Sequence, residues 1–168
     1  MNTAAVLTIS DSAFRGTRKD LSGPAVVEQL VAAGFRVEIT AIVPDERDQI
    51  QDKLVQCCRA VRLVVTAGGT GIAARDVTPE ATVAVCERLI PGIPERMRAA
   101  GSAKTPLAAL SRGVCGVLGK SLVLNLPGSP KAAVESLQAV VGILPHALDL
   151  LDGKTQHPEQ GNQTGTNT

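Results

Sequence analysis

Short runs of branched aliphatic residues alternate with amphipathic stretches along most of this chain, and this alternation is its most constraining feature. Five runs predict strands: residues 4–9, 35–43, 63–66, 114–118 and 121–125. Between the first two runs, apolar residues recur at helical spacing from Ser22 until Gly34. Continuously apolar strands separated by helices predict an α/β fold, namely a three-layer sandwich with a mostly parallel sheet and helices on both faces.

The remaining helices are predicted from caps and apolar spacing. We expect one after Asp45, one from Thr78 as N-cap carrying Val83, Val85, Cys86 and Leu89, short ones at 94–98 and 105–110, and a long one from the N-cap Ser129 to about residue 151. A chain of 168 residues suits one domain, which we place at residues 1–153. Residues 154–168 are rich in Gln, Asn, Thr and Gly and predict a disordered polar tail.

Composition excludes several classes of function. Aromatic residues make up 1% of the chain and the net charge is +1, so neither base stacking nor a strong basic surface points to nucleic acid or membrane. Two His and four Cys without a C-x-x-C pair argue against a zinc site, and we expect the thiols to be buried and reduced. A basic signal peptide and an uninterrupted apolar span are both lacking, which predicts a cytoplasmic protein.

Polar segments follow four of the predicted strands, after Ile9, Val43, Thr66 and Asn125. Because ligands of parallel α/β sheets bind beyond the carboxyl ends of the strands, we expect these segments to meet at one rim. The segment after Thr66 contains Gly68, Gly69, Thr70 and Gly71. These glycines favour either a tight turn or a backbone N–H nest for an anion, and without a Gly-Lys-Ser/Thr sequence they do not form a P-loop.

Carboxylates lie close to these segments, at Asp45 and Asp76. Each has two interpretations, either as a helix-capping group or as a ligand for Mg²⁺, which joins carboxylate oxygens to phosphate oxygens. The magnesium interpretation explains why a carboxylate stands beside a phosphate-binding loop. Arg75 precedes Asp76 and supplies a nearby cation.

Two other clusters accompany the glycine segment. One joins Ser10 and Asp11 to a loop with Arg15, Arg18 and Lys19, which either binds phosphate or is simply solvated. Another comprises Ser111, Arg112 and the segment from Asn125 through Pro127 and Gly128 to Ser129. Ser129 begins a helix, and a helix N-terminus favours anions.

Taken together, these motifs resemble the molybdopterin-binding family, and most of all its Mog- and MoaB-type adenylyltransferases. The resemblance covers about residues 4 to 153, in order, and rests on four segments: Thr66-Ala-Gly-Gly-Thr-Gly71, Arg75-Asp-Val-Thr-Pro-Glu-Ala-Thr82, Leu110-Ser-Arg112 and Leu124-Asn-Leu-Pro-Gly128. Three further segments also fit: Ile9-Ser-Asp-Ser12, Asp20-Leu-Ser-Gly-Pro24 and Ile42-Val-Pro-Asp-Glu46. The chain departs from many members at Ala67, where a second Thr is common.

The resemblance implies a function in molybdenum cofactor biosynthesis. Such enzymes transfer AMP from Mg-ATP to the terminal phosphate of molybdopterin and release pyrophosphate. By position, Asp45 and Asp76 correspond to the family's catalytic, metal-associated aspartates, and Gly68 to Gly71 to its glycine loop. Ser111, Arg112 and Asn125 to Gly128 correspond to segments that line the pterin and nucleotide pocket.

The resemblance also implies an assembly and a place in a pathway. Family members are usually homotrimers, some of them hexamers, and they hand their product to a molybdenum-insertion enzyme. Two alternatives stay open: a non-catalytic pterin-binding or carrier protein of the same family, and a nucleotide hydrolase built on the same domain.

Overall fold

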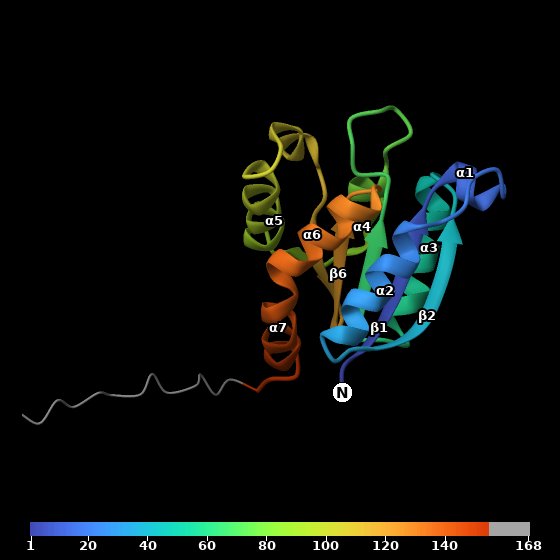
Figure 1. Ribbon diagram of the computed structural model, residues 1–168. Coiled ribbons are helices and arrows are strands. Elements are labelled where there is room, and N and C mark those ends of the chain that lie inside the picture. Colours follow the sequence, from blue (N-terminus) through green and yellow to red (C-terminus); the bar gives the residue numbers. More distant parts are fainter. Residues whose placement is uncertain (155–168) are drawn as a thin grey trace, which may run out of the picture.

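A six-stranded mixed sheet forms the centre of the molecule, in the order β2-β1-β3-β6-β5-β4. The computed structural model describes residues 1–154, and its layers are visible in Figure 1. The strands are β1 (Thr3–Ile9), β2 (Arg36–Val43), β3 (Leu63–Ala67), β4 (Arg88–Leu89), β5 (Cys115–Leu118) and β6 (Ser121–Leu126). Strands β2, β1, β3 and β6 are mutually parallel, whereas β5 and β4 run antiparallel to their neighbours. The predicted α/β fold with a mostly parallel sheet is confirmed.

Helices cover both faces of this sheet. The helical elements are α1 (Asp11–Phe14), α2 (Ser22–Ala32), α3 (Arg47–Cys58), α4 (Thr78–Val85), α5 (Gly92–Ser102), α6 (Pro130–Val140), α7 (Leu144–Leu151) and the 3₁₀ turns η1 (Pro106–Leu110) and η2 (Val141–Ile143). Helices α2 and α6 lie on the near face in Figure 1, while α3 and α4 lie behind the sheet. The predicted tail begins at residue 154, so all but its first residue falls outside the described residues.

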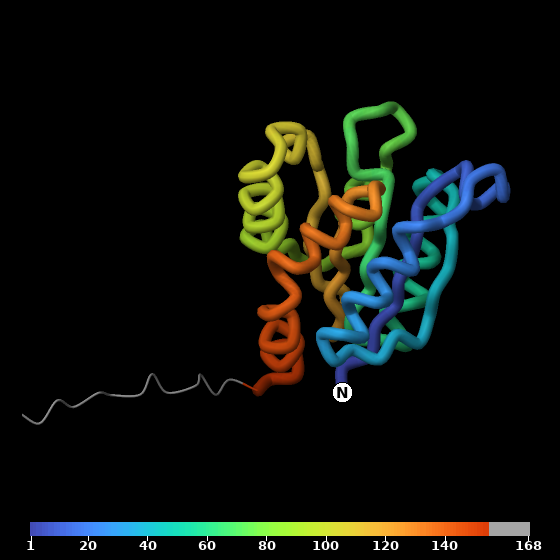
Figure 2. Tube along the Cα trace, viewed as in Figure 1, coloured from blue at the N-terminus to red at the C-terminus, as the bar shows by residue number. Residues whose placement is uncertain are grey.

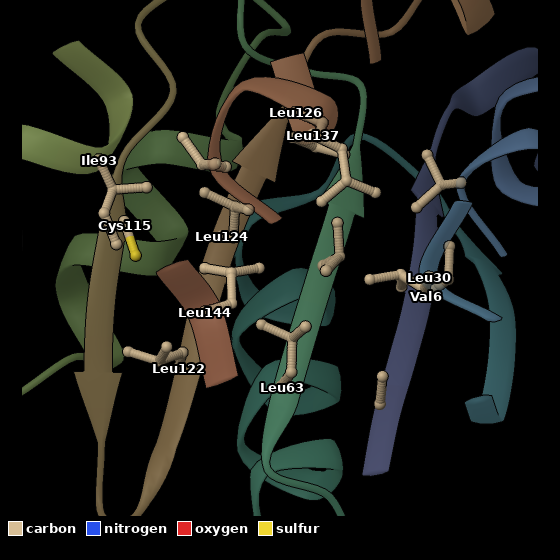
Figure 3. Close-up of a cluster of buried hydrophobic side chains, with 14 of the residues drawn as sticks. Val6, Leu30, Leu63, Ile93, Cys115, Leu122, Leu124, Leu126, Leu137 and Leu144 are labelled. Carbon is tan, nitrogen blue, oxygen red and sulfur yellow. The ribbon is translucent and has the colours of Figure 1, made fainter. Parts of the chain in front are cut away.

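Side-chain alternation along the strands divides the core into two clusters. In β1, Val6 packs toward α2, whereas Leu7 packs toward α3. Figure 3 shows the first cluster, in which Leu122 and Leu124 of β6 meet Leu137 and Leu144 from the last helices. Because successive strand residues point to opposite faces, an apolar run without interruption supplies both layers at once.

Helix α4 is shorter than the sequence predicts. It ends at Val85, Val83 is exposed, and Leu89 belongs instead to the edge strand β4. The chain leaves the helix because Cys86 is extended and the Glu87 N–H donates to the Val117 carbonyl oxygen at 2.9 Å. Pairing with β5 thus outweighs the local helical spacing.

The predicted caps of two helices are also wrong. Glu46 is the N-cap of α3 and Val77 is the N-cap of α4, so Asp45 and Thr78 do not cap these helices. Ser129 is the N-cap of α6 as predicted, and its Oγ accepts the Ala132 N–H at 3.2 Å. The short helix predicted at 94–98 extends over all of α5.

The last helical stretch is broken rather than continuous. By length and composition alone, Pro130–Leu151 would suffice to cross a membrane. In the fold it is divided by η2 and by a proline near the start of α7, where the missing N–H breaks the helical hydrogen bonding. Its inward side chains, among them Leu137, Leu144 and Leu148, are fully buried in the core. The stretch therefore serves as a core element.

The four cysteines are free thiols. Cys57 and Cys115 are buried, as predicted, whereas Cys58 and Cys86 are only half-buried. Burial raises the pKa of the Cys58 thiol to about 12 and that of Cys86 to about 11. These groups therefore remain protonated and weakly nucleophilic at neutral pH.

Candidate active site

The carboxyl ends of the parallel strands bring distant segments of the chain together. The Ser10 N–H donates to the Val43 carbonyl oxygen at 2.9 Å, and the Gly68 N–H donates to the Leu126 carbonyl oxygen at 3.1 Å. Figure 2 shows the loop after β3 (green) and the turn before α6 (orange) at this same end of the molecule. The rim predicted from strand polarity is therefore present.

The glycine segment begins with two left-handed residues, Gly68 at φ +112° and Gly69 at φ +64°. A Cβ atom on Gly68 would clash with the Ile9 carbonyl oxygen, and one on Gly69 would clash with the Thr78 hydroxyl. Gly128 approaches closely as well, since its Cβ would lie 3.3 Å from the Gly68 Cα. Glycine is required at 68 and 69 because both φ values are positive and a Cβ atom would overlap the Ile9 backbone or the Thr78 side chain. The tight turn predicted at these glycines is therefore present, and Gly68 and Gly69 also line the pocket described below.

Asp45 is held by backbone rather than by a cation. Its Oδ2 accepts the Asp11 N–H at 2.8 Å, and the Asp45 N–H in turn donates to Asp11 Oδ1 at 3.1 Å. Partial burial raises the pKa of the Asp45 carboxyl, and the nearby charges of Asp11 and Asp76 add to this rise. The site therefore concentrates negative charge in a partly desolvated place, which a divalent cation would relieve.

Asp76 lies at the end of the loop that follows the glycines. Its Oδ2 accepts the Ala73 N–H at 2.9 Å, and a Cβ on Gly71 would come within 2.7 Å of the same oxygen. Thr78 closes the base of this loop, because its hydroxyl donates to the Gly68 carbonyl oxygen at 2.9 Å. The buried Thr78 therefore stabilises this loop through its hydroxyl and does not cap α4, contrary to the prediction from the sequence.

A polar pocket of about 370 Å³ joins both carboxylates to the glycine segment. Its lining residues include Thr8, Ser10, Arg18, Lys19, Asp20, Ser22, Asp45, Gly68, Gly69, Asp76, Gly128 and Ser129. It thus combines two basic side chains, the N-terminal end of α6 and three carboxylates, those of Asp20, Asp45 and Asp76. Arg18 and Lys19 of the basic loop face this pocket, which favours the phosphate-binding interpretation of that loop.

The oxygen ligands in this pocket fit Mg²⁺, which takes part of its coordination from substrate and water, better than they fit a metal ion held entirely by protein side chains. Among residues 1–154, no cluster of three or more His, Cys, Asp or Glu side chains is arranged to hold a metal ion. Asp45 and Asp76 supply two carboxylates in one pocket. Mg²⁺ is usually bound by one or two carboxylates together with substrate phosphates and water.

A second pocket of about 390 Å³ lies beside the first and is mostly apolar. Six of the site residues predicted from the sequence line this pocket: Thr70, Gly71, Ser111, Pro127, Gly128 and Ser129. Met97 of α5 and Leu107 of η1 provide apolar surface that sequence reasoning did not select. Gly128 and Ser129 line both pockets. Two ligands bound in them would therefore meet at this turn.

Four of the predicted site residues line neither of these pockets. Arg75 instead spans the rim: its Nε donates to Asp11 Oδ2 at 2.6 Å and its Nη2 to Glu46 Oε1 at 2.8 Å. The hydrogen bond from Arg75 lowers the pKa of the Asp11 carboxyl. Asp11 and Arg75 are thus paired with each other at the rim, outside both pockets.

Asn125 is fully buried in β6. Its Nδ2 donates to the hydroxyls of Thr66 at 3.1 Å and Thr82 at 2.9 Å, and its Oδ1 accepts the Val114 N–H at 3.2 Å. The fourth residue outside both pockets, Arg112, is likewise bonded to protein groups. Asn125 and Arg112 stabilise the walls behind the pockets.

Sequence reasoning missed a support for the turn at Gly128. The Ser22 hydroxyl, at the start of α2, donates to the Gly128 carbonyl oxygen at 2.6 Å. Asp20 accepts the Thr8 hydroxyl at 2.7 Å and the Gly23 N–H at 3.0 Å, so it holds the start of α2. The only signal was the segment from Asp20 to Pro24, which resembled the family but suggested no chemistry.

A mostly parallel α/β sheet that carries a glycine turn, two carboxylates and a helix N-terminus at its carboxyl rim is typical of proteins that bind phosphorylated ligands. The family model for a probable molybdopterin binding domain matches residues 5–146. The chain belongs to this molybdopterin-binding family.

Relatives extend over nearly the whole chain. Molybdopterin adenylyltransferase of Helicobacter pylori is 43% identical over 94% of this chain and 92% of its own length. The enzyme of the same name from Escherichia coli is 40% identical over 91% of this chain and 88% of its own. The crystal structure of the molybdopterin biosynthesis enzyme MoaB from Thermus thermophilus superposes with a TM-score of 0.86 at 50% identity, covering 92% of this chain and 98% of that one.

Proposed function

We propose that this protein is a molybdopterin adenylyltransferase of molybdenum cofactor biosynthesis, which transfers AMP from ATP to the terminal phosphate of molybdopterin. The observation that carries this proposal is the pair of adjoining pockets that share Gly128 and Ser129, with Asp45 and Asp76 in the polar one. Two relatives that are named for this activity match the chain over nearly its full length.

The reaction requires two anions to meet. A phosphate oxygen of molybdopterin attacks the α-phosphorus of ATP, a new oxygen–phosphorus bond forms, and the bond from the α-phosphorus to the bridging oxygen of the β-phosphate breaks, so that pyrophosphate leaves. The attacking phosphate is already ionised, so the chain needs to supply little general-base help. Positioning and electrostatic stabilisation therefore dominate catalysis.

In this proposal each group in the polar pocket has a charge-related task. Asp45 and Asp76 would hold Mg²⁺, which when bound neutralises phosphate charge. Arg18 and Lys19 attract the phosphates, and the N–H groups at the start of α6 orient them. The apolar pocket beside Met97 and Leu107 excludes water from one side of the reacting groups. We assign the planar ring of a substrate to that pocket.

The same family relationship supports further proposals about setting. We propose a homotrimer, or a hexamer of six chains, that works in the cytoplasm and passes its product to a molybdenum-insertion enzyme. The free state of the four cysteines is compatible with a reducing compartment.

The decisive experiment measures pyrophosphate release by the purified protein with ATP and Mg²⁺, in the presence and absence of molybdopterin. We expect release only when molybdopterin is added. A protein that binds molybdopterin but releases no pyrophosphate would be a carrier of the same family. A protein that consumes the nucleotide without the pterin would be a hydrolase, and either outcome would overturn the proposal.

A further inference from the structure

The loop that carries Asp76 is held from outside by a single arginine. Arg112 follows η1 and has three separate side-chain contacts with this loop and the helix behind it. Its Nε donates to the Gly71 carbonyl oxygen at 2.6 Å, its Nη2 to the Asp76 carbonyl oxygen at 2.7 Å, and its Nη1 to Glu80 Oε1. The Arg112 N–H also donates to the Thr70 carbonyl oxygen at 2.8 Å.

These contacts fix both ends of the loop at once. Thr70 and Gly71 lie at its beginning and Asp76 lies at its end, so one guanidinium sets the distance between them. A planar guanidinium offers donors in a rigid fork, which an ammonium group on a flexible stem does not reproduce. Glu80, in the first turn of α4, completes the arrangement, because its carboxylate pairs with the third arm of the fork.

Arg112 is not among the residues that line the two pockets, although its neighbour Ser111 lines the apolar one. Each of its three side-chain nitrogens donates to a protein oxygen, of Gly71, Glu80 or Asp76. The guanidinium is therefore directed at the loop and at α4, outside both pockets.

We propose that Arg112 and Glu80 are positioning residues that hold the Asp76 carboxylate in the place its chemistry requires. This rests on the proposed function, in which Asp76 lies beside the reacting phosphates. Because Ser111 and Arg112 are adjacent, the arrangement also connects the wall of the apolar pocket to the acid of the polar one. Misplacement of reacting groups by about 1 Å costs on the order of 10²-fold in rate.

Arg112→Lys tests this role, because the substitution keeps the positive charge and loses the fork. We expect kcat for pyrophosphate release to fall by about 10²-fold, with little change in the KM for ATP or molybdopterin. We also expect hydrogen exchange at the amides of residues 71–78 to accelerate. Glu80→Gln leaves the Arg112 fork intact and removes only the negative charge of one of its partners, so it should shift both readouts in the same direction by less. It remains informative if Arg112→Lys does not fold.

A matched control exists at the opposite end of the sheet. Arg62 also donates to two carbonyl oxygens, of Lys120 and Leu148, and to one carboxylate, of Asp152. Arg62→Lys should therefore lower stability without changing kcat or exchange in residues 71–78.

The outcomes separate the inference from the function on which it rests. A raised KM with unchanged kcat in Arg112→Lys would show direct substrate binding and overturn the positioning role, as would unchanged exchange in residues 71–78. If the parent protein itself releases no pyrophosphate, the proposed function fails. The exchange measurement then still decides whether Arg112 holds the loop.

Discussion

At the scale of single residues, Asp45 and Asp76 of the polar pocket are held in place by different contacts. Asp45 exchanges hydrogen bonds with the backbone of Asp11, and its position is set by two strand ends. Asp76 depends on its own loop, through the Ala73 N–H, and on Arg112 behind it. Charge at Asp76 is therefore the more easily altered without disturbing the sheet.

Asp76→Asn should lower turnover by about 10²–10³-fold, the loss typical when one electrostatic contact in an active site is removed. The amide keeps the shape and an acceptor for the Ala73 N–H, so molybdopterin binding should persist. Steady-state pyrophosphate release and calorimetric titration with molybdopterin provide the two measurements. Asp52→Asn, on the exposed side of α3, is the control. Turnover at the parent rate in Asp76→Asn would refute the assignment.

At the scale of elements, buried polar contacts join strands to helices behind the pockets. Asn125 in β6 links Thr66 of β3 to Thr82 of α4, and it also receives the Val114 N–H. Because the buried side chain is saturated, it fixes the spacing of three elements beneath the rim. The pocket walls therefore depend on a residue that no ligand touches.

Asn125→Ala should reduce the free energy of unfolding by about 3 kcal/mol, because each buried polar group left without a partner costs about 1–3 kcal/mol. Urea denaturation at neutral pH gives the measurement. Gln138→Ala removes an exposed amide whose Nε2 donates to Gln29 Oε1 at 2.9 Å, and it should change stability little. Equal stability of the two variants would contradict the role given to Asn125.

At the scale of the whole molecule, the two ends of the sheet have separate tasks. The carboxyl rim gathers the pockets, whereas the opposite end is closed by Arg62, which joins the start of β3 to Asp152 beyond α7. The contacts of Arg62 stabilise the fold and lie away from the pockets. Stability and activity should therefore respond to different substitutions.

The closing ion pair gives stability a predictable dependence on pH. The hydrogen bond from Arg62 lowers the pKa of Asp152 below its ordinary value of 3.8. A lowered folded-state pKa stabilises the fold at pH values above the unfolded-state pKa, and this contribution is lost as pH falls through the folded value. Asp152→Asn should therefore be less stable than the parent at pH 7, and this difference should shrink below pH 3.8. Urea titrations at several pH values test it, and a difference independent of pH would count against the pairing.

The proposed trimer or hexamer can be tested by measuring the mass of the protein in solution. Aliphatic side chains remain exposed on the described surface, including Val31 of α2 and Ile42 of β2. Such surface is available for contact between copies of the chain. Light scattering during gel filtration should give a mass of three or six times the 17.4 kDa chain. A monomer at micromolar concentration would rule out the proposed trimer.

The sequence by itself determined the parallel part of the sheet and the rim at its carboxyl end. Apolar runs that are buried on both faces are typical of parallel strands covered by helices, and the carboxyl ends of parallel strands lie at one edge of the sheet. For that reason Asp45, Asp76 and the glycines were found to share one place. The glycine run itself was readable as a turn or an anion nest, and the structure adds that Gly68 and Gly69 have positive φ values, where a side chain would be strained.

Only the tertiary structure decided which polar residues face a pocket. Arg112, Arg75 and Asn125 are as polar as the residues that line the pockets, but each finds protein partners at least eleven residues away in the sequence. The same holds for β4, where pairing with β5 ends the predicted helix early. Local spacing fixes which face of an element is apolar, whereas the direction of a long polar side chain depends on partners that only folding brings near.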